Sequence, residues 1–177
     1  GRYYLLEGYL YPDTYDFYEK DDPARALNKL LVNFENKFSE RAEEQLEELN
    51  EKLAKRWASQ GYDEEYIAEH RFGIYELITV ASMIEKETSS VAESGKISSV
   101  IYNRLKNSSD FPYLNIDATI VYALGGNIDP TTGLSKPLTD KDMQLDHPYN
   151  TYKNRGLPPG PISNPGRNAL DAALSPD

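Results

Sequence analysis

The stretch that decides the fold runs from Ile74 to Thr88 and has the sequence IYELITVASMIEKET. Its apolar residues occupy most of a helical wheel, which predicts a helix that is covered on most sides by other segments of the chain. The polar residues Thr79, Ser82 and Lys86 share the remaining side. We therefore expect residues 74–88 to form a largely buried helix.

Two glutamates interrupt this apolar surface. Glu85 lies inside the apolar arc, and Glu87 lies near its other flank. A carboxylate in such a place must be paired, hydrogen-bonded or protonated, because desolvation disfavours the charged form. A glutamate with a raised pKa suits general-acid catalysis near neutral pH, whereas a helix-end carboxylate paired with arginine or lysine serves structure alone. The two side chains point about 160° apart, so they cannot face one another as a catalytic pair, and periodicity does not choose between them.

Residues 24–60 predict one long amphipathic helix near the N-terminus, which we interpret as a helical insertion or arm. Asp22 is expected to cap it, Pro23 suits its first position, and Gly61 suits its end. Charged residues would form its solvated face. Its apolar residues follow steps of three and four: Leu27, Leu30, Leu31, Phe34, Phe38, Leu46, Leu49, Leu53 and Trp57.

Three more helices are predicted towards the C-terminus. They are a helix with the apolar stripe Ile97, Val100, Ile101 and Leu105, a short helix over 118–124 capped by Asp117 and stopped by Gly125 and Gly126, and a final helix from Asn164-Pro165 to Leu174. Aromatic and aliphatic residues make Arg2–Tyr11 the best candidate for a strand. The sequence therefore predicts an α+β fold, mostly helical with a small β component.

Composition narrows the function. The chain has 177 residues, enough for one domain, and a net charge of −10, which argues against binding to nucleic acid or to an anionic membrane by charge. It has no cysteine, which excludes disulfides, thiol nucleophiles and thiolate zinc sites. The only histidines are His70 and His147, which argues against His-rich metal sites and most Ser-His-Asp schemes. We expect neither a metal nor a cofactor. The longest nearly apolar run, 78–84, is far shorter than the roughly 20 residues of a membrane helix.

The chain is rich in side chains that suit a sugar-binding groove. It has 14 tyrosines, together with Asn103, Asn115, Asn150 and Thr151, which could stack on sugar rings and hydrogen-bond their hydroxyls. The alternative is that most of the tyrosines are core residues whose hydroxyl alone reaches a polar partner.

Several segments together resemble the MltG (YceG-like) endolytic murein transglycosylases, and the match covers most of residues 5–176. The segments, in order, are 6–15 (LEGYLYPDTY), 81–88 (ASMIEKET), 101–105 (IYNRL), 149–152 (YNTY) and 156–166 (GLPPGPISNPG). The resemblance implies a bacterial lytic transglycosylase with one membrane anchor and an extracytoplasmic catalytic domain. Such an enzyme cleaves the MurNAc-β-1,4-GlcNAc bond inside nascent peptidoglycan strands, leaves 1,6-anhydro-MurNAc ends, and is associated with penicillin-binding proteins.

The resemblance also implies site residues. The family's catalytic acid is the first glutamate of Glu-Lys-Glu-Thr, here Glu85, so Glu87 is expected to serve stability or positioning. The usual Gln-x-Asp-Pro-Thr motif is replaced here by Asn115-Ile116-Asp117-Ala118-Thr119. The candidate substrate-binding residues are Tyr102, Asn103, Asn115, Asp117, Thr119, Tyr122, Asn150, Thr151 and Tyr152.

We expect residues 1–177 to be a single catalytic domain cut from a longer protein. In the family, a membrane helix and a small LysM-like domain precede this region, and a strand-rich stretch follows it. Three other interpretations remain open: a peptidoglycan-binding module without activity, a lysozyme-type hydrolase with Asp117 as its second carboxylate, and a scaffold whose 24–60 helix binds a cell-wall synthase.

Overall fold

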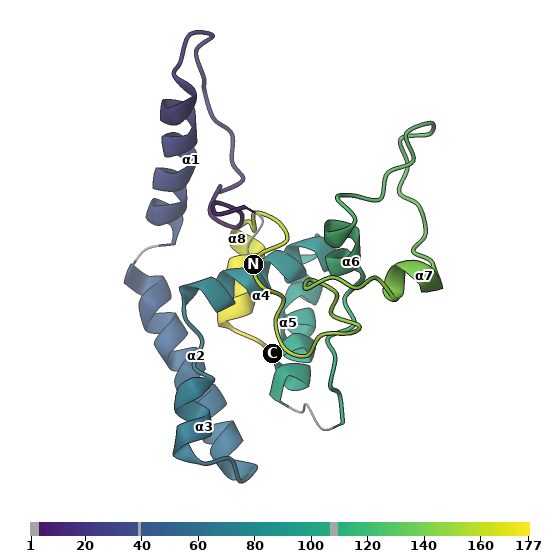
Figure 1. Cartoon of the computed structure of the whole chain (residues 1–177). Helices are drawn as coiled ribbons and strands as arrows, with labels where there is room; N and C mark the ends of the chain where they lie inside the picture. Colours follow the sequence, from purple (N-terminus) through teal and green to yellow (C-terminus); the bar gives the residue numbers. More distant parts are fainter. Residues whose placement is uncertain (1–3, 39, 107–109) are drawn as a thin grey trace.

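The computed structural model describes residues 4–38, 40–106 and 110–177, and Figure 1 shows the arrangement of their helices. In chain order the helices of this part are α1 (Pro23–Lys37), α2 (Glu40–Ser59), α3 (Glu64–Glu69), α4 (Ile74–Glu87), α5 (Val91–Lys106), α6 (Asp117–Ala123), α7 (Asp140–Met143) and α8 (Arg167–Leu174). The described residues contain no sheet, and the only β pairing among them is one isolated bridge between Ile128 and Ser135.

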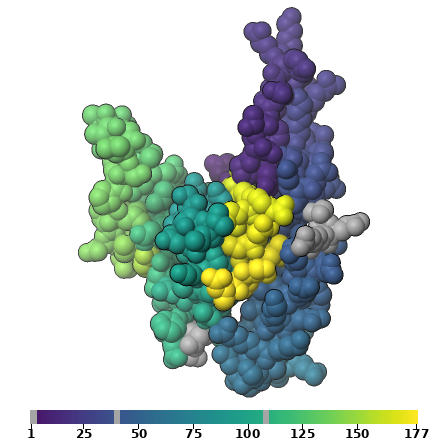
Figure 2. All heavy atoms as spheres, turned by 180° about the vertical axis from the view of Figure 1, so that it is seen from behind, coloured from purple at the N-terminus to yellow at the C-terminus, as the bar shows by residue number. Residues whose placement is uncertain are grey.

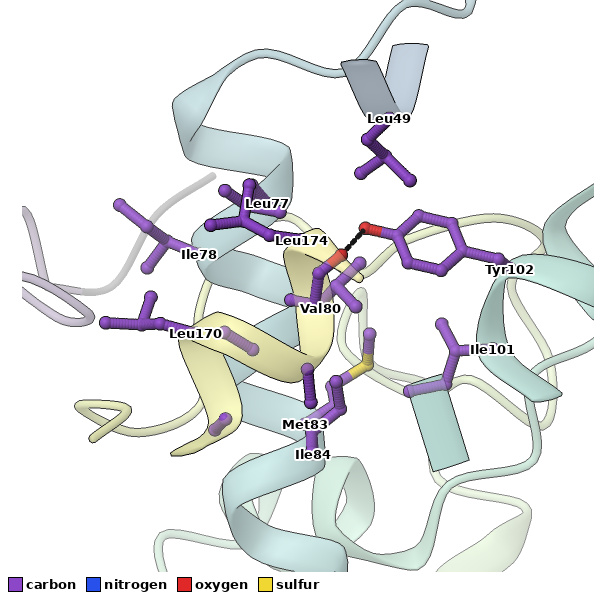
Figure 3. Packing of buried hydrophobic residues seen from close by; sticks show 14 of the residues in the cluster. Leu49, Leu77, Ile78, Val80, Met83, Ile84, Ile101, Tyr102, Leu170 and Leu174 are labelled. Atoms are coloured by element: carbon purple, nitrogen blue, oxygen red, sulfur yellow. Dashed lines mark hydrogen bonds between the residues drawn. The ribbon is translucent and has the colours of Figure 1, made fainter. Parts of the chain in front are cut away.

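Helix α4 forms the centre of the molecule, as its sequence predicts. Each residue from 77 to 84 is at most 1% exposed. Helices α5 and α8 pack against α4 and against each other, and Figure 3 shows their side chains meeting around Val80 and Met83. The start of the helix is fixed by Glu76, whose carboxylate accepts the Gly73 amide at 3.0 Å.

The polar side of α4 is buried too, because a C-terminal loop pairs with it. The Ser82 hydroxyl donates to the Thr79 carbonyl at 2.7 Å and accepts the Ile162 amide at 3.0 Å. The Ser163 hydroxyl donates to the Ser82 carbonyl at 3.0 Å. These bonds satisfy polar groups that would otherwise be buried without partners, and they hold loop 160–163 against α4.

The prediction of an α+β fold was wrong, and the strand expected at Arg2–Tyr11 is replaced by turns in its described part. The Tyr9 amide donates to the Leu6 carbonyl at 3.1 Å, and Gly8 has a φ of +91° that a strand does not use. The Asn164 carbonyl oxygen accepts the Gly8 amide at 2.8 Å and the Leu10 amide at 3.0 Å, so a side chain takes the place of a neighbouring strand. Residues 1–3 lie outside the described part of the chain.

The prediction of one helix over 24–60 was also wrong, because the chain leaves helical geometry at Phe38. Phe38 has φ −106° and ψ 61°, and its ring stacks on Phe34 at a centroid distance of 5.3 Å. The predicted start is confirmed: Pro23 is the first helical residue, and the Asp22 carboxylate accepts the Ala24 amide at 3.0 Å. The segment therefore forms two helices, of which α1 runs away from the body of the molecule (Figure 1).

The helices predicted after α4 are present as α5, α6 and α8, but α6 is not capped by Asp117. Its N-cap residue is Ile116, and Asp117 is the first helical residue. Gly125 and Gly126 follow the helix with φ values of +74° and +109°, which confirms them as its stop. The short helices α3 and α7 were not predicted from the sequence. Among the described residues no helix is both long and apolar enough to cross a membrane.

Two projections rise from the helical body. We call residues 12–37, which end in α1, the helix arm, and residues 126–139, which lie between α6 and α7, the loop arm. Figure 2 shows the molecule hollowed between them, with residues of α4, α5 and α8 below.

Candidate active site

A pocket of about 820 Å³ lies between the C-terminal end of α4, helix α6 and the turn that begins at Tyr4. Its position at Gly125 and Gly126 places it at the base of the loop arm. The volume falls in the range of small-molecule sites, so the pocket can admit sugar residues. The lining residues are Tyr4, Lys86, Glu87, Asp117, Ala118, Val121, Tyr122, Ala123, Gly125, Gly126, His147 and Ile162.

Glu87 brings a carboxyl group with a raised pKa to this pocket. Burial is the largest cause of the rise, and the negative charge of Asp117 adds to it, because both disfavour the ionised form. The Ala118 amide at the start of α6 donates to Glu87 and acts in the opposite direction. Glu87 is nevertheless an exposed residue, as Glu85 is, so burial covers only part of its side chain. A carboxyl group in this setting can both hold a proton and meet a ligand.

Asp117 lies beside Glu87 and binds a tyrosine. Its carboxylate accepts a hydrogen bond from the hydroxyl of Tyr152. Burial, followed by this hydrogen bond and the Asp117 charge, raises the pKa of Tyr152 to about 12, so the hydroxyl stays protonated and donates near neutral pH. The sequence-based candidates Asp117 and Tyr152 are therefore brought together next to Glu87.

Thr119 and Thr151 position the start of α6 from below the surface. The Thr151 hydroxyl oxygen accepts the Ile116 amide at 3.0 Å and lies 2.9 Å from the Thr119 hydroxyl oxygen. Thr119 donates to the Ile116 carbonyl at 2.7 Å. Both threonines are at most 1% exposed, so the structure gives them a supporting position behind Asp117 rather than a place on the pocket wall.

Asn150 is also completely buried and organises the loop that carries Tyr152. Its amide group donates to the carbonyls of Met143 and Leu145 at 3.0 and 2.7 Å. Its carbonyl oxygen accepts the Tyr152 amide at 2.9 Å. Like the two threonines, Asn150 acts on the site through the residues that it holds.

Tyr122 forms an aromatic wall of the pocket. Its hydroxyl lies 3.4 Å from the Glu7 carboxylate and donates to it, and its ring centroid lies 4.9 Å from that of Tyr149. Burial, and then the Glu7 charge, raise the pKa of Tyr122. This residue presents an aromatic face where a sugar ring could stack.

Three other candidates lie apart from the pocket. Tyr102 is buried and donates to the Ala173 carbonyl at 2.9 Å, which links α5 to α8 (Figure 3). The Asn103 carbonyl oxygen accepts from Lys106 at 2.6 Å, beside a separate cavity of about 140 Å³ between α2 and α5. Asn115 is exposed, has a φ of +54°, and borders a second cavity of about 290 Å³ that Glu87 also borders. Sugar contacts by these residues stay predictions.

Glu85 faces the opposite side of α4 and does not line the described pocket. Its carboxylate accepts the Gly166 amide at 3.0 Å, and Gly166 is the N-cap residue of α8. Glu85 is exposed at this point. It therefore occupies a position where a carboxylate satisfies the free amide of a helix start. Its assignment as the catalytic acid stays a prediction.

Sequence reasoning did not single out Tyr4, Lys86, His147 or Ile162 as pocket residues. Lys86 stands between the two candidate glutamates in sequence, and this proximity was the one signal that could have found it. The other three come from segments far apart in the chain, and only the folded structure brings them together. Among the described residues no group of His, Asp and Glu side chains could hold a metal ion.

Helices and loops alone build this site, and the ionisable side chains that line it are a lysine, two carboxylates, two tyrosines and a histidine. Fold and site thus define a helical domain with an acid-bearing pocket. The model of the YceG-like family matches residues 2–177, so the chain belongs to the YceG-like family.

Relatives of known sequence and structure agree with this assignment. The chain is 35% identical over 172 residues to the endolytic murein transglycosylase of Bacillus subtilis strain 168, a match that covers 97% of this chain and 39% of that protein. It is 30% identical over 175 residues to the enzyme of the same name from Streptococcus pneumoniae strain D39, covering 99% of this chain and 27% of that protein. The chain thus spans well under half the length of these relatives.

The fold is also similar to a solved structure. A crystal structure of a yceG-like protein from Listeria monocytogenes superposes with a TM-score of 0.72 and 34% sequence identity. The match covers 97% of this chain and 46% of that one.

Proposed function

We propose that this chain carries the catalytic site of a lytic transglycosylase that cleaves murein glycan strands internally. Membership of the YceG-like family and two relatives named endolytic murein transglycosylase support the reaction class. The hollow between the helix arm and the loop arm supports internal cleavage, because a strand can pass between two separate projections without being threaded by its end (Figure 2).

The observation that carries the proposal is the position of Glu87. It is a carboxyl group with a raised pKa on the wall of an 820 Å³ pocket, and a general acid needs both properties near neutral pH. Glu85, to which the family resemblance assigns the acid role, bonds instead to the start of α8. We therefore propose Glu87 as the acid because it lines the pocket, and Glu85, the residue that the family resemblance assigns, is the alternative that an experiment must separate from it.

One carboxyl group can perform the whole reaction. Glu87 donates its proton to the oxygen of the bond between MurNAc and GlcNAc as that bond breaks. The resulting carboxylate then takes the proton of the MurNAc 6-hydroxyl, whose oxygen closes on C1 to give the 1,6-anhydro sugar. Because this nucleophile is tethered within the substrate, the reaction needs no second carboxylate and gains from intramolecular attack.

A lysozyme-type hydrolase is the second candidate, because Asp117 lies in the same pocket as Glu87. In that reaction a second carboxylate acts as nucleophile or activates a water. The hydrogen bond from Tyr152 to Asp117 already occupies part of the Asp117 carboxylate, which favours a supporting role for it.

The products of murein cleavage separate the possibilities. Un-crosslinked glycan strands would be incubated with the protein, and the fragments would be analysed by mass spectrometry. The control is the Glu87→Gln variant, which lacks the proposed acid and serves as the blank. We expect internal fragments with 1,6-anhydro ends that the blank does not release. Reducing ends that incorporate labelled water would establish the hydrolase instead, and intact strands that bind without cleavage would establish a binding module.

The cellular setting follows from the same proposal. Murein strands are made at the outer face of the cell membrane, so we propose that the complete protein is membrane-anchored with this region outside the cytoplasm. Partnership with a strand-making penicillin-binding protein is part of this proposal. Co-purification of the complete protein with such a synthase from solubilised membranes would test it.

A further inference from the structure

The pocket carries one lysine that the proposed reaction does not use. Lys86 lies between Glu85 and Glu87 in α4, it is exposed, and it lines the pocket. Ser82 lies one helical turn earlier on the same side of α4 and binds the amide of Ile162, which also lines the pocket. Lys86 therefore extends from a helix that is buried over residues 77–84, and it shares the pocket lining with Ile162.

Lys86 has no carboxylate partner within the described part of the chain. The ion pairs found there involve Lys29, Lys55, Arg71, Lys136 and Arg167, each with a carboxylate within 4 Å, and none involves Lys86. The other acidic groups of the pocket, Glu87 and Asp117, lie towards α6. An ammonium group next to a substrate pocket without an internal partner is suited to an anionic ligand group.

Like charges repel, so a carboxylate of a ligand is better placed near the Lys86 ammonium group than near Glu87 and Asp117. A murein strand can offer carboxylates from two sources. A strand without peptides exposes the lactyl carboxylate of each MurNAc residue, whereas a strand with stem peptides has that group in an amide bond and offers the carboxylates of the peptide. The chemistry that Lys86 recognises is the same in both cases.

We propose that Lys86 binds a carboxylate of the murein strand and thereby contributes to substrate specificity. This inference rests on the proposed function for the identity of the ligand. In this role Lys86 orients the strand along the Ile162 wall, while Glu87 and Asp117 stay on the side where the bond is cleaved. Lys86 would act on binding, so its loss should appear in KM and not in kcat.

The test compares Lys86→Met with Lys86→Arg, which keeps the charge, and with Lys55→Met, which removes the same charge from α2. Each variant would be assayed on peptide-bearing strands, on strands stripped of peptide, and on stripped strands whose lactyl carboxylates are converted to methylamides. For Lys86→Met we expect KM to rise about two- to fivefold, the effect of one exposed ion pair, with kcat within about twofold of wild type. Added salt should reduce the difference.

The substrate arms identify the source of the carboxylate. If the lactyl group is bound, the rise in KM appears on stripped strands and disappears on the methylamide. If the stem peptide supplies the carboxylate, the rise appears only on peptide-bearing strands. An unchanged KM for Lys86→Met on every substrate, or an equal rise for Lys55→Met, would overturn the proposal.

Direct binding separates this inference from the reaction itself. Affinities of the same three strands for the wild-type protein and for Lys86→Met would be measured by fluorescence anisotropy of end-labelled glycan. If the wild-type protein binds strands without cleaving them and Lys86→Met binds them about two- to fivefold more weakly, the proposed reaction fails and the role of Lys86 stands. Normal cleavage with an unchanged affinity for Lys86→Met would overturn the role of Lys86 and leave the proposed reaction in place.

Discussion

The two sides of the last turn of α4 differ in what they contact. On one side, Glu85 accepts the Gly166 amide at the start of α8, and its carboxylate completes the hydrogen bonds of a helix end. On the other side, Glu87 meets α6, where burial and the Asp117 charge raise its pKa. Two glutamates that are separated by one residue thus have different physical surroundings. The partner helix therefore sets the surroundings of each carboxyl group, and the sequence motif alone does not give them.

Replacement of each glutamate by glutamine gives the largest expected difference between the two sides. Glu87→Gln should lower the rate of murein cleavage by at least about a hundredfold, because general-acid catalysis typically contributes about 10²–10⁴-fold. Glu85→Gln keeps an oxygen that can accept the Gly166 amide and should retain activity within a few fold. A rate assay on un-crosslinked strands measures both, and the opposite pattern would return the acid role to Glu85.

Melting curves of the same variants serve as the control for folding. The folded state holds the Glu87 proton more tightly than the unfolded chain, so ionised Glu87 disfavours folding at a pH above its folded pKa. This penalty is lost as the pH falls through that raised pKa towards the ordinary pKa of a glutamate in the unfolded chain. Glu87→Gln should therefore melt at the wild-type temperature or higher near neutral pH, and a lower melting temperature would indicate a structural role.

Asp117→Asn gives an effect of intermediate size on the pocket side. Loss of the Asp117 charge lowers the pKa of Glu87, although burial, the larger cause of the rise, remains. Since a general acid must be protonated, the high-pH limb of the kcat profile should move to lower pH. Tyr152→Phe keeps the Asp117 charge, so the high-pH limb of its kcat profile should not move to lower pH. A profile that stays in place for Asp117→Asn would separate Asp117 from the acid.

Glu85→Ala gives the smallest expected effect, on the other side of the helix. The substitution leaves the Gly166 amide to water and removes a negative charge from the start of α8. We expect it to lower the free energy of unfolding by about 0.5–1 kcal/mol, as for other exposed helix-end interactions. Urea denaturation measures this change, and a loss of several kcal/mol would show that the contact is more than a surface interaction.

Local patterns predict the helices best where burial is one-sided or complete. The apolar residues that surround most of the predicted helix at 74–88 predict α4 almost to its ends. Asp22 and Pro23 predict the start of α1. The prediction of a strand at residues 2–11 was wrong because the pattern of apolar residues does not show that Asn164 binds this segment. The Asn164 side chain accepts the Gly8 and Leu10 amides, although it is distant in sequence. The end of α1 at Phe38 could not be predicted either, because the helical spacing of apolar residues continues on both sides of Phe38.

The candidate site shows the same limit. Asn150 and Thr151 look like sugar-binding residues in the sequence, yet both are at most 1% exposed and bind backbone groups. A polar residue type predicts that a hydrogen bond exists but not whether its partner is a ligand or the chain itself. The different surroundings of Glu85 and Glu87 depend on where α8 and α6 pack on α4, and the periodicity of the sequence does not predict that arrangement.

The hollow between the two arms makes the entry of a strand directly observable. Thr132 at the tip of the loop arm and Glu19 in the helix arm are both exposed, and the chain contains no natural cysteine. The double variant Thr132→Cys/Glu19→Cys would therefore accept two spin labels at defined positions and nowhere else. Pulsed electron–electron double resonance would measure the distance between the two labels. It would show whether the two arms move closer together around a bound glycan or keep the same distance throughout the reaction.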